Sequence, residues 1–410
     1  MKGTRALLTL FRALRHRPFA LLWSGQTVSI LGDRVFQVAL AWWVLQKTGS
    51  AVAMGTVFVL TTIPMLAFLL LGGVFVDRFP RLRLMVISDL VRGPVISLMA
   101  LLAFTNSLTI WHVYAFSLIS GFVEAFFQPA YRAAVPEVSP AEDLPSANSL
   151  TSLSGQLSGI AGPALGATIV ALGGTPLAFA LDGLSFFISA CCLLPLLRLA
   201  TLPQGQEASH GILGDLREGL GAVTTSPWLW ITIGVAGISN IAYAGPMEVT
   251  LPFLLKDRWQ AEVGVLGLFY SASSLGSVLA AAWLGRLPRL RRRGLTLYGS
   301  WMLIGVLVMA IGLPITIPGI LLASLMIGAC NTILSLVWVN TLQEFVPRNL
   351  LGRVTSVDYL GSYLLLPLGY ALGGWAAEAL GPSLVFVLGG ALQTVLIALG
   401  LLHPQVRSLD

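Results

Sequence analysis

The chain has 410 residues, of which 56% are hydrophobic and only 10% are charged. Soluble globular proteins carry roughly 25% charged residues, so the surface of this chain is too poor in charge to face water. Mean hydropathy is +0.84, and apolar runs of about 20 residues, the length that crosses a bilayer as a helix, recur along the sequence. These values exclude a soluble enzyme and predict an integral membrane protein of many helices.

Twelve apolar segments are predicted as membrane-spanning helices. The first is too long for a cleaved signal peptide and carries Asp33. A polar stretch at 200–226 separates six segments from six, which predicts an all-α membrane protein of two six-helix halves, 1–199 and 227–410, joined by a cytoplasmic linker with an amphipathic helix. In chain order the segments are 19–46, 51–76, 84–104, 110–131, 147–173, 176–198, 228–254, 262–285, 294–313, 318–344, 352–380 and 383–403.

Basic residues gather on one side of this arrangement. The largest groups lie in the N-terminal arm (Lys2, Arg5, Arg12, Arg15 and Arg17) and in the loops around 78–83 and 286–293, whereas the opposite side holds Lys47, Lys256 and Arg258. Short cytoplasmic loops are enriched in Lys and Arg. Both termini are therefore placed in the cytoplasm of a multi-pass protein of the inner or plasma membrane, and the net charge of +6 needs no nucleic-acid partner.

The two halves share short motifs at corresponding places. Arg-x-Pro-Arg-Leu-Arg follows the second segment at 78–83 and the eighth at 286–291. Val-Pro follows the fourth segment at 135–136 and the tenth at 346–347. Parallel repeats of this kind are typical of transporters that bind substrate between their halves near the membrane midplane.

The loop after the second segment resembles the signature loop of the major facilitator superfamily, with Pro80 where that family has Gly. The resemblance implies the twelve-helix fold and a loop that helps hold the halves together in the outward-open state. We expect the pair Asp89 and Arg92, three residues apart in the third segment, to support this loop. The predicted conformational-gate motif comprises Gly73, Asp77, Arg78, Arg81 and Arg83, with Asp89 and Arg92.

Further stretches resemble the drug:proton antiporter branch that includes macrolide efflux proteins and the enterobactin exporter. They include Trp23-Ser-Gly25-Gln26, Ala125-Phe-Phe-Gln-Pro129-Ala130 and Leu181-Asp182-Gly-Leu-Ser-Phe186. Gly162, Pro163 and Gly166 in the fifth segment match part of the antiporter motif. The resemblance implies export.

Among the acids of the predicted spans, six are candidates for a site in the membrane: Asp33, Asp89, Glu124, Asp182, Glu248 and Asp358. A charge at the bilayer centre costs at least about 2.5–3.5 kcal/mol, so each is a functional candidate. Asp182 is also expected as a structural residue, Asp358 at the membrane boundary and Glu248 in water. A carboxyl group in a low-dielectric site takes up a proton more readily near neutral pH, and we predict Asp33 and Glu124 as the proton-coupling residues.

Polar side chains follow helical spacing on four spans that the resemblance places around a central cavity. The predicted substrate-cavity residues are Gln26 and Gln37 on the first span, Gln128 and Tyr131 on the fourth, Asn240 and Tyr243 on the seventh, and Asn331 and Trp338 on the tenth. A weakly polar, aromatic cavity suits an amphipathic ligand. Hydrogen bonding between helices explains the residues of the second half equally well.

The energy source is expected to be an ion gradient. A P-loop needs Gly-Lys, and none of Lys2, Lys47 and Lys256 follows a glycine. No metal site or cofactor is expected, since the three cysteines lack ligand spacing, and no nucleophile–base set points to an enzyme. The sequence predicts a monomeric, proton-coupled exporter of amphipathic small molecules by alternating access. The alternatives are a dedicated metabolite or siderophore exporter, and then a lipid scramblase or a passive channel.

Overall fold

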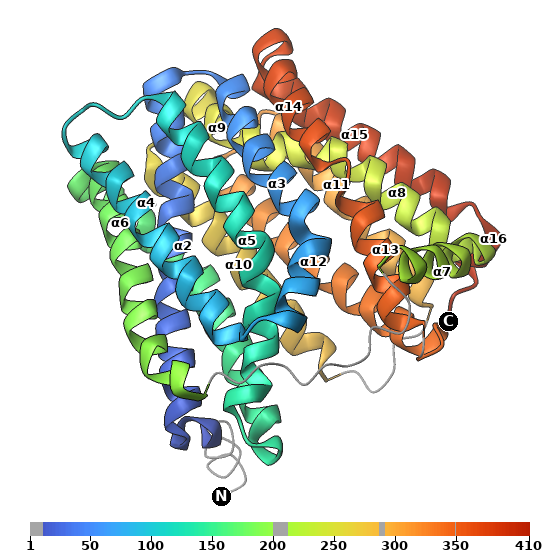
Figure 1. Cartoon of the computed structure of the whole chain (residues 1–410). Coiled ribbons are helices and arrows are strands. Elements are labelled where there is room, and N and C mark those ends of the chain that lie inside the picture. The colour runs from blue at the N-terminus through green and yellow to red at the C-terminus, as the bar shows by residue number, and fades with distance from the viewer. Residues whose placement is uncertain (1–10, 200–211, 287–291, 349) are drawn as a thin grey trace, which may run out of the picture. The chain divides into compact units, whose positions relative to one another are not determined.

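A computed structural model of the chain is built of helices and turns and describes residues 11–199, 212–286, 292–348 and 350–410 (Figure 1). Within these ranges no residue lies in a β-strand. Ten helices of the described part are long and apolar enough to cross a membrane. The prediction of an all-helical membrane protein is therefore confirmed.

The chain forms two compact units. One comprises Met1–Trp43 and Leu60–Glu207, and the other comprises Val44–Val59 and Ala208–Asp410. The segment Val44–Val59 thus packs in the second unit, although it belongs to the first half of the sequence. A Cβ at Gly55 would lie 2.6 Å from the carbonyl oxygen of Tyr370, so a glycine at this position permits the close packing.

The first unit is built mainly from long helices. A kink divides α6, because Gly174 has φ +75°, a backbone angle that glycine adopts without steric conflict. The kink separates the two spans predicted at 147–173 and 176–198. The helices that lie wholly or, for α2 and α3, partly in this unit are η1 (Arg12–Arg15), α2 (Arg17–Thr48), α3 (Ala51–Arg78), α4 (Arg81–Phe104), α5 (Ile110–Val138), η2 (Ala141–Asp143), α6 (Leu144–Leu193) and η3 (Leu194–Leu199).

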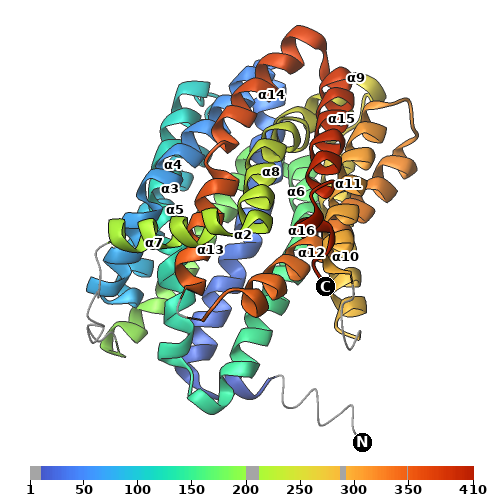
Figure 2. The same cartoon turned by 90° about the vertical axis from the view of Figure 1, so that its right-hand side faces the viewer.

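The second unit contains more interrupted helices. The span predicted at 228–254 includes the π-helical segment η4, and the span predicted at 352–380 is divided between α13 and α14, which Figure 2 shows as successive segments. The elements are α7 (Ile212–Thr225), α8 (Pro227–Ala244), η4 (Gly245–Thr250), α9 (Leu251–Trp259), α10 (Val263–Leu284), α11 (Arg293–Gly312), α12 (Ile317–Phe345), α13 (Leu351–Tyr363), α14 (Leu366–Leu380), α15 (Pro382–Leu401) and α16 (Pro404–Arg407).

Glycines bring corresponding helices together in both units. In the first unit, a Cβ at Gly121 of α5 would lie 2.0 Å from the carbonyl oxygen of Thr61 in α3. In the second unit, a Cβ at Gly328 of α12 would lie 1.8 Å from the carbonyl oxygen of Ser273 in α10. Small residues let membrane helices approach closely enough for backbone contact. The helix pairs α3–α5 and α10–α12 therefore each cross at a glycine.

A second pair of crossings repeats in the same way. A Cβ at Gly166 of α6 would lie 2.9 Å from the Cα of Val35 in α2, and one at Gly373 of α14 would lie 2.2 Å from the Cα of Gly245. The packing of α6 against α2 in the first unit thus resembles the packing of α14 against η4 in the second unit.

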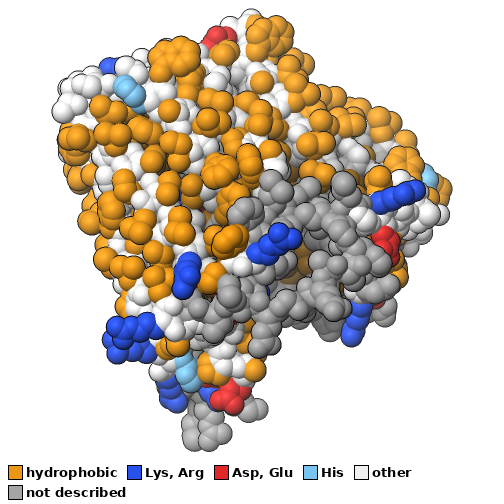
Figure 3. Space-filling model, viewed as in Figure 1, with side chains coloured by type: hydrophobic (Ala, Val, Ile, Leu, Met, Phe, Trp, Pro, Cys, Tyr) orange, Lys and Arg blue, Asp and Glu red, His pale blue; other side chains and the backbone are white. Residues whose placement is uncertain are grey.

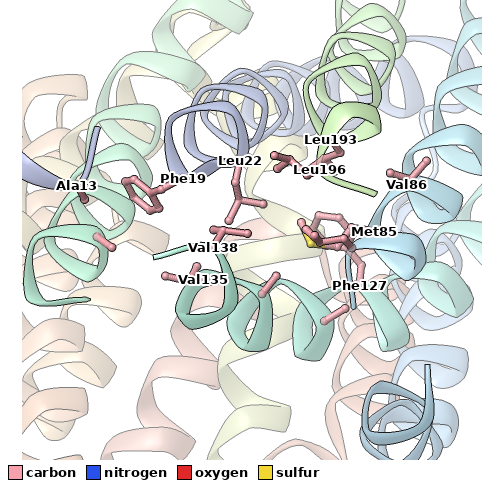
Figure 4. Packing of buried hydrophobic residues seen from close by; sticks show 14 of the residues in the cluster. Ala13, Phe19, Leu22, Met85, Val86, Phe127, Val135, Val138, Leu193 and Leu196 are labelled. Atoms are coloured by element: carbon pink, nitrogen blue, oxygen red, sulfur yellow. The ribbon is translucent and has the colours of Figure 1, made fainter. Parts of the chain in front are cut away.

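The outer faces of the helices are apolar. Figure 3 shows hydrophobic side chains spread over the face in view, and Leu172 and Trp111 are 84% and 75% exposed. Lipid is the solvent that such a surface requires. Inside the first unit, side chains of α2, α4, α5 and α6 form a buried cluster, which includes Phe19, Met85 and Phe127 (Figure 4).

Candidate functional site

Arg92 of α4 is the centre of a buried polar network in the first unit. Its side chain is only 7% exposed. One guanidinium nitrogen donates to Asp89 Oδ1 at 3.4 Å, and another donates to Glu124 Oε2 at 3.3 Å. The guanidinium carbon also lies 4.1 Å from the ring centroid of Phe127 and 4.6 Å from that of Phe186. A planar guanidinium can bind two carboxylates and stack on aromatic rings at once, which an ammonium cannot.

Neutral side chains extend this network to four helices. The hydroxyl of Ser189 in α6 donates to Asp89 Oδ2 at 2.6 Å and accepts from Gln26 Nε2 of α2 at 2.8 Å. Gln128 Nε2 donates to Glu124 Oε1 at 2.7 Å. The Arg92 network therefore joins α2, α4, α5 and α6 through hydrogen bonds.

Two further carboxylates lie near Arg92. Asp182 of α6 is 1% exposed and packs against α2, where a Cβ at Gly32 would lie 2.6 Å from Asp182 Oδ1. Asp33, which follows Gly32 in α2, is exposed. The positive charge of Arg92 acts on both aspartates. Together with Asp89 and Glu124, four carboxylates share the field of Arg92, and Arg34 adds a second positive charge beside Asp33.

The structure separates the residues predicted for the first span. Gln26 is 1% exposed and bonds to α6, whereas Asp33 is exposed and Gln37 is half-buried. Gln37 Oε1 accepts a hydrogen bond from Arg34 at 3.3 Å. On the fourth span, Tyr131 is half-buried, with its ring stacked on that of Phe127 at 6.2 Å.

The residues of the predicted gate motif lie in three environments. Asp89 and Arg92 do pair, but the second partner of Arg92 is Glu124 of α5. Arg81 forms an ion pair with Glu137 at 2.6 Å, and Arg78 and Arg83 are exposed. The surroundings of Gly73, the side chain of Asp77 and residues 287–291 of the motif in the second half lie outside what the structure describes.

The motif of the fifth span lies against the first span. A Cβ at Gly162 would lie 2.4 Å from the Cβ of Arg34, and Pro163 and Gly166 are also buried within α6. These residues therefore keep α6 in contact with α2 beside Asp33.

The second unit contains a cavity of about 380 Å³. Its walls come from α8, η4 and α11 to α15. All four residues predicted for the second half line it: Asn240, Tyr243, Asn331 and Trp338. Asn331 Nδ2 donates to Tyr243 Oη at 3.4 Å, and Asn240 Nδ2 donates to the carbonyl of Ser362 at 2.8 Å. These amides therefore line the cavity and also bond its walls together.

Two acids of this cavity were not assigned to the site from the sequence. Asp358 of α13 and Glu248 of η4 line it, and Trp338 Nε1 donates to Asp358 Oδ2 at 2.9 Å. Ser362, one turn further along α13, donates to Asp358 Oδ1 at 3.4 Å. The spacing of Asp358 and Ser362 on one helix face was the available signal for Asp358.

Comparison with known proteins identifies the family to which this helical chain belongs. Residues 8–409 match the transmembrane secretion effector family of the major facilitator superfamily. The chain belongs to this family. The resemblance inferred from the motifs is therefore confirmed, and the matched family is one of transporters.

The relatives of this chain include two named exporters. Macrolide efflux protein A of Streptococcus pyogenes is 25% identical over 405 residues, which cover 96% of this chain and 97% of that protein. Enterobactin exporter EntS of Shigella boydii is 27% identical over 419 residues, which cover 98% of each. The chain thus matches both relatives over nearly their whole length.

Solved structures share the fold at low sequence identity. A bacterial homologue of the iron transporter ferroportin, in an inward-facing state, has a TM-score of 0.75 at 14% identity and covers 94% of this chain and 99% of its own. A POT family transporter in complex with 5-aminolevulinic acid has a TM-score of 0.73 at 12% identity, with coverage of 96% and 97%. These matches show that the chain shares the fold of these transporters.

Proposed function

We propose that this protein is a proton-coupled secondary exporter of amphipathic small molecules that works by alternating access. The observation that carries the proposal is the group of four carboxylates around Arg92 in the first unit. The names of two full-length relatives, a macrolide efflux protein and an enterobactin exporter, support outward transport. The substrate and protons are its proposed partners, and the proposed working form is a monomer in the plasma membrane with both termini in the cytoplasm.

The charge balance of the Arg92 network favours proton exchange. Four ionised carboxylates beside two guanidinium groups would leave net negative charge in a low-dielectric site, which is costly. A bound proton lowers that cost. Asp89 and Asp182 are enclosed, whereas Asp33 is exposed and the side chain of Glu124 is 29% exposed. Glu124 and Asp33 are therefore the residues that exchange protons with water.

Protonation of Glu124 would also change helix packing. The neutral acid is a weaker partner for Arg92 than the carboxylate, because it no longer carries the negative charge that attracts the guanidinium. Arg92 would then pair mainly with Asp89 on its own helix, and the link between α4 and α5 would loosen. Proton binding is thereby coupled to the conformation of the first unit.

The repeated glycine crossings support twelve spans in two related halves. Gly121 and Gly328 occupy corresponding crossings, as do Gly166 and Gly373. With α6 counted as two spans at Gly174 and α13 with α14 as one, the ten long helices become twelve. Two related halves that rock around a midplane site are a common transporter design.

Transport in proteoliposomes tests the coupling. The wild-type protein should accumulate erythromycin or ethidium when an imposed pH gradient drives exchange, and should also exchange labelled for unlabelled compound without a gradient. Glu124→Gln and Asp33→Asn should lose gradient-driven accumulation and keep exchange, because the carrier still moves but no longer exchanges the proton. Full gradient-driven transport by both variants would refute the assignment. Conductance without exchange would indicate a channel, and lipid movement between leaflets a scramblase.

A dedicated siderophore or metabolite exporter is the second candidate, favoured by the 27% identity to the enterobactin exporter along the whole chain. Secretion of metabolites by a deletion strain, compared with its resistance to a panel of macrolides and dyes, separates the two. A broad loss of resistance supports the first function, and loss of one secreted compound supports the second.

A further inference from the structure

We propose that the cavity of the second unit binds an organic cation, whose positive group is held by Asp358 and Glu248 against aromatic rings. This inference assigns a substrate class to the proposed exporter and rests on that function for its biological meaning. Binding itself requires neither a proton gradient nor transport, so the two proposals can be tested separately.

The charge of the cavity selects a cation. Asp358 and Glu248 both line it, and the lining residues, all within the described part of the chain, include no Lys, Arg or His. The partners of Asp358 are the neutral donors Trp338 and Ser362. A carboxylate in a low-dielectric site is stabilised by a cation. In this cavity a cationic ligand would supply that positive charge.

The aromatic lining suits an organic cation in particular. Five aromatic residues line the cavity: Tyr243, Trp301, Trp338, Tyr363 and Tyr370. A cation over the face of an aromatic ring is attracted by the negative charge density of that face, and Trp is the best such partner. The volume of about 380 Å³ lies within the range of roughly 300–1,000 Å³ for ligand pockets. The cavity can therefore enclose a small amphipathic cation.

Trp338 is held in place before any ligand arrives. Its indole nitrogen donates to Asp358 Oδ2 at 2.9 Å, and its ring meets the ring of Trp228 edge-on, with centroids 5.9 Å apart and an angle of 72° between planes. A preordered side chain loses little conformational entropy on binding. The Trp338–Asp358 pair thus presents an aromatic ring beside a carboxylate in a fixed geometry.

An unused acceptor lies in the same wall. Gln393 of α15 is 2% exposed and lines the cavity, and its Oε1 has no hydrogen-bond partner among the described residues. A buried polar atom without a partner is unfavourable, and an N–H group of a ligand would satisfy it. Glu248 lies on the π-helical segment η4, a feature that occurs frequently at functional sites.

Other ligand classes fit less well. An anion would meet two carboxylates and an acceptor oxygen. A metal ion needs several converging hard or imidazole ligands, and the described residues contain no group of three His, Cys, Asp or Glu side chains that could hold one. The cavity therefore favours an organic cation over an anion or a metal ion.

Tetraphenylphosphonium and tetraphenylborate provide a matched test, because they have nearly the same shape and opposite charge. Equilibrium binding of labelled tetraphenylphosphonium is measured on the purified full chain in detergent, with unlabelled tetraphenylborate and neutral triphenylphosphine oxide as competitors. We expect tetraphenylphosphonium to bind saturably and tetraphenylborate to compete poorly. Equal competition by both ions, or absence of saturable binding, would overturn the inference.

Two substitutions remove charge and keep shape. Asp358→Asn retains an oxygen to accept from Trp338, and Glu248→Gln retains the length of the side chain. Each should weaken tetraphenylphosphonium binding about tenfold, the loss typical of one charged hydrogen-bonding partner, and the double variant should abolish it. Glu262→Gln, which changes an exposed acid outside the cavity, should leave binding unchanged.

Retained binding of triphenylphosphine oxide shows that a variant is folded. A folded double variant that binds tetraphenylphosphonium as wild type does would refute the role of the two acids. Wild-type protein that binds the cation but does not use a pH gradient would contradict the proposed coupling alone. Protein that accumulates a macrolide under a gradient but does not bind the cation would contradict this inference alone.

Discussion

Replacement of Arg92 by Met provides a quantitative test of the Arg92 network. Met keeps an unbranched side chain against Phe127 and Phe186 but removes the guanidinium that contacts Asp89 and Glu124. Removal of one partner of a buried ion pair costs about 3–5 kcal/mol, because a buried charge is left uncompensated. Lost stacking adds little, since a thioether also contacts aromatic rings favourably, by ~0.3–1.5 kcal/mol. We therefore expect the free energy of unfolding to fall by about 3–5 kcal/mol.

Reversible unfolding in mixed micelles, with denaturing detergent as the titrant, measures this change. The double variant Asp89→Asn/Arg92→Met should recover part of the loss, because it no longer buries an uncompensated aspartate. Arg81→Met is the matched control: its ion pair with Glu137 is more exposed, and exposed pairs contribute about 0–1 kcal/mol. If Arg92→Met costs no more than Arg81→Met, the reasoning about the Arg92 network is wrong.

Two packing predictions follow from the glycines. Gly328→Leu should force α12 away from Ser273 and greatly reduce the yield of monodisperse protein. Gly299→Leu is the control and should be tolerated, because an added Cβ there would meet open space. Similar yields of the two variants would contradict the close crossing of α12 and α10. Gly174→Ala should lower the free energy of unfolding by about 1–2 kcal/mol, because an L-residue is strained at φ +75°. An unchanged unfolding curve would show that the kink of α6 does not depend on a positive φ at Gly174.

Much of the fold was predictable because apolar length alone marks a membrane helix. The breaks inside spans were harder to predict. The segment η4 and the junction between α13 and α14 interrupt runs whose composition stays apolar, and their geometry depends on contacts such as that of Gly373 with Gly245. A contact of this kind joins segments far apart in the sequence, so local pattern does not reveal it.

The candidate site was predictable only in part, because residue spacing describes one helix and not its neighbours. Helical spacing placed Asn331 and Trp338 on one face of α12, and both line the cavity. Spacing also grouped Gln26 with Asp33, but Gln26 is buried against Ser189. A row of polar residues at helical spacing defines one face of a helix, but it does not determine which neighbouring helix packs against that face.

Partners across helices could not be predicted from the sequence. Glu124 is 32 residues from Arg92, and no spacing rule links positions on different helices. Asp358 was expected at the membrane boundary because the end of its span was uncertain. Its hydrogen bond with Trp338 depends on how α12 and α13 pack.

The most direct test of the central claim is the pH change outside proteoliposomes when substrate is added. A lightly buffered suspension of vesicles that contain the wild-type protein should show proton movement opposite to that of erythromycin or ethidium, and a protonophore should abolish the substrate gradient. Vesicles with Glu124→Gln should move no protons. Substrate accumulation without any proton movement, or proton movement unchanged in Glu124→Gln, would contradict a proton-coupled exporter built on the Arg92 network.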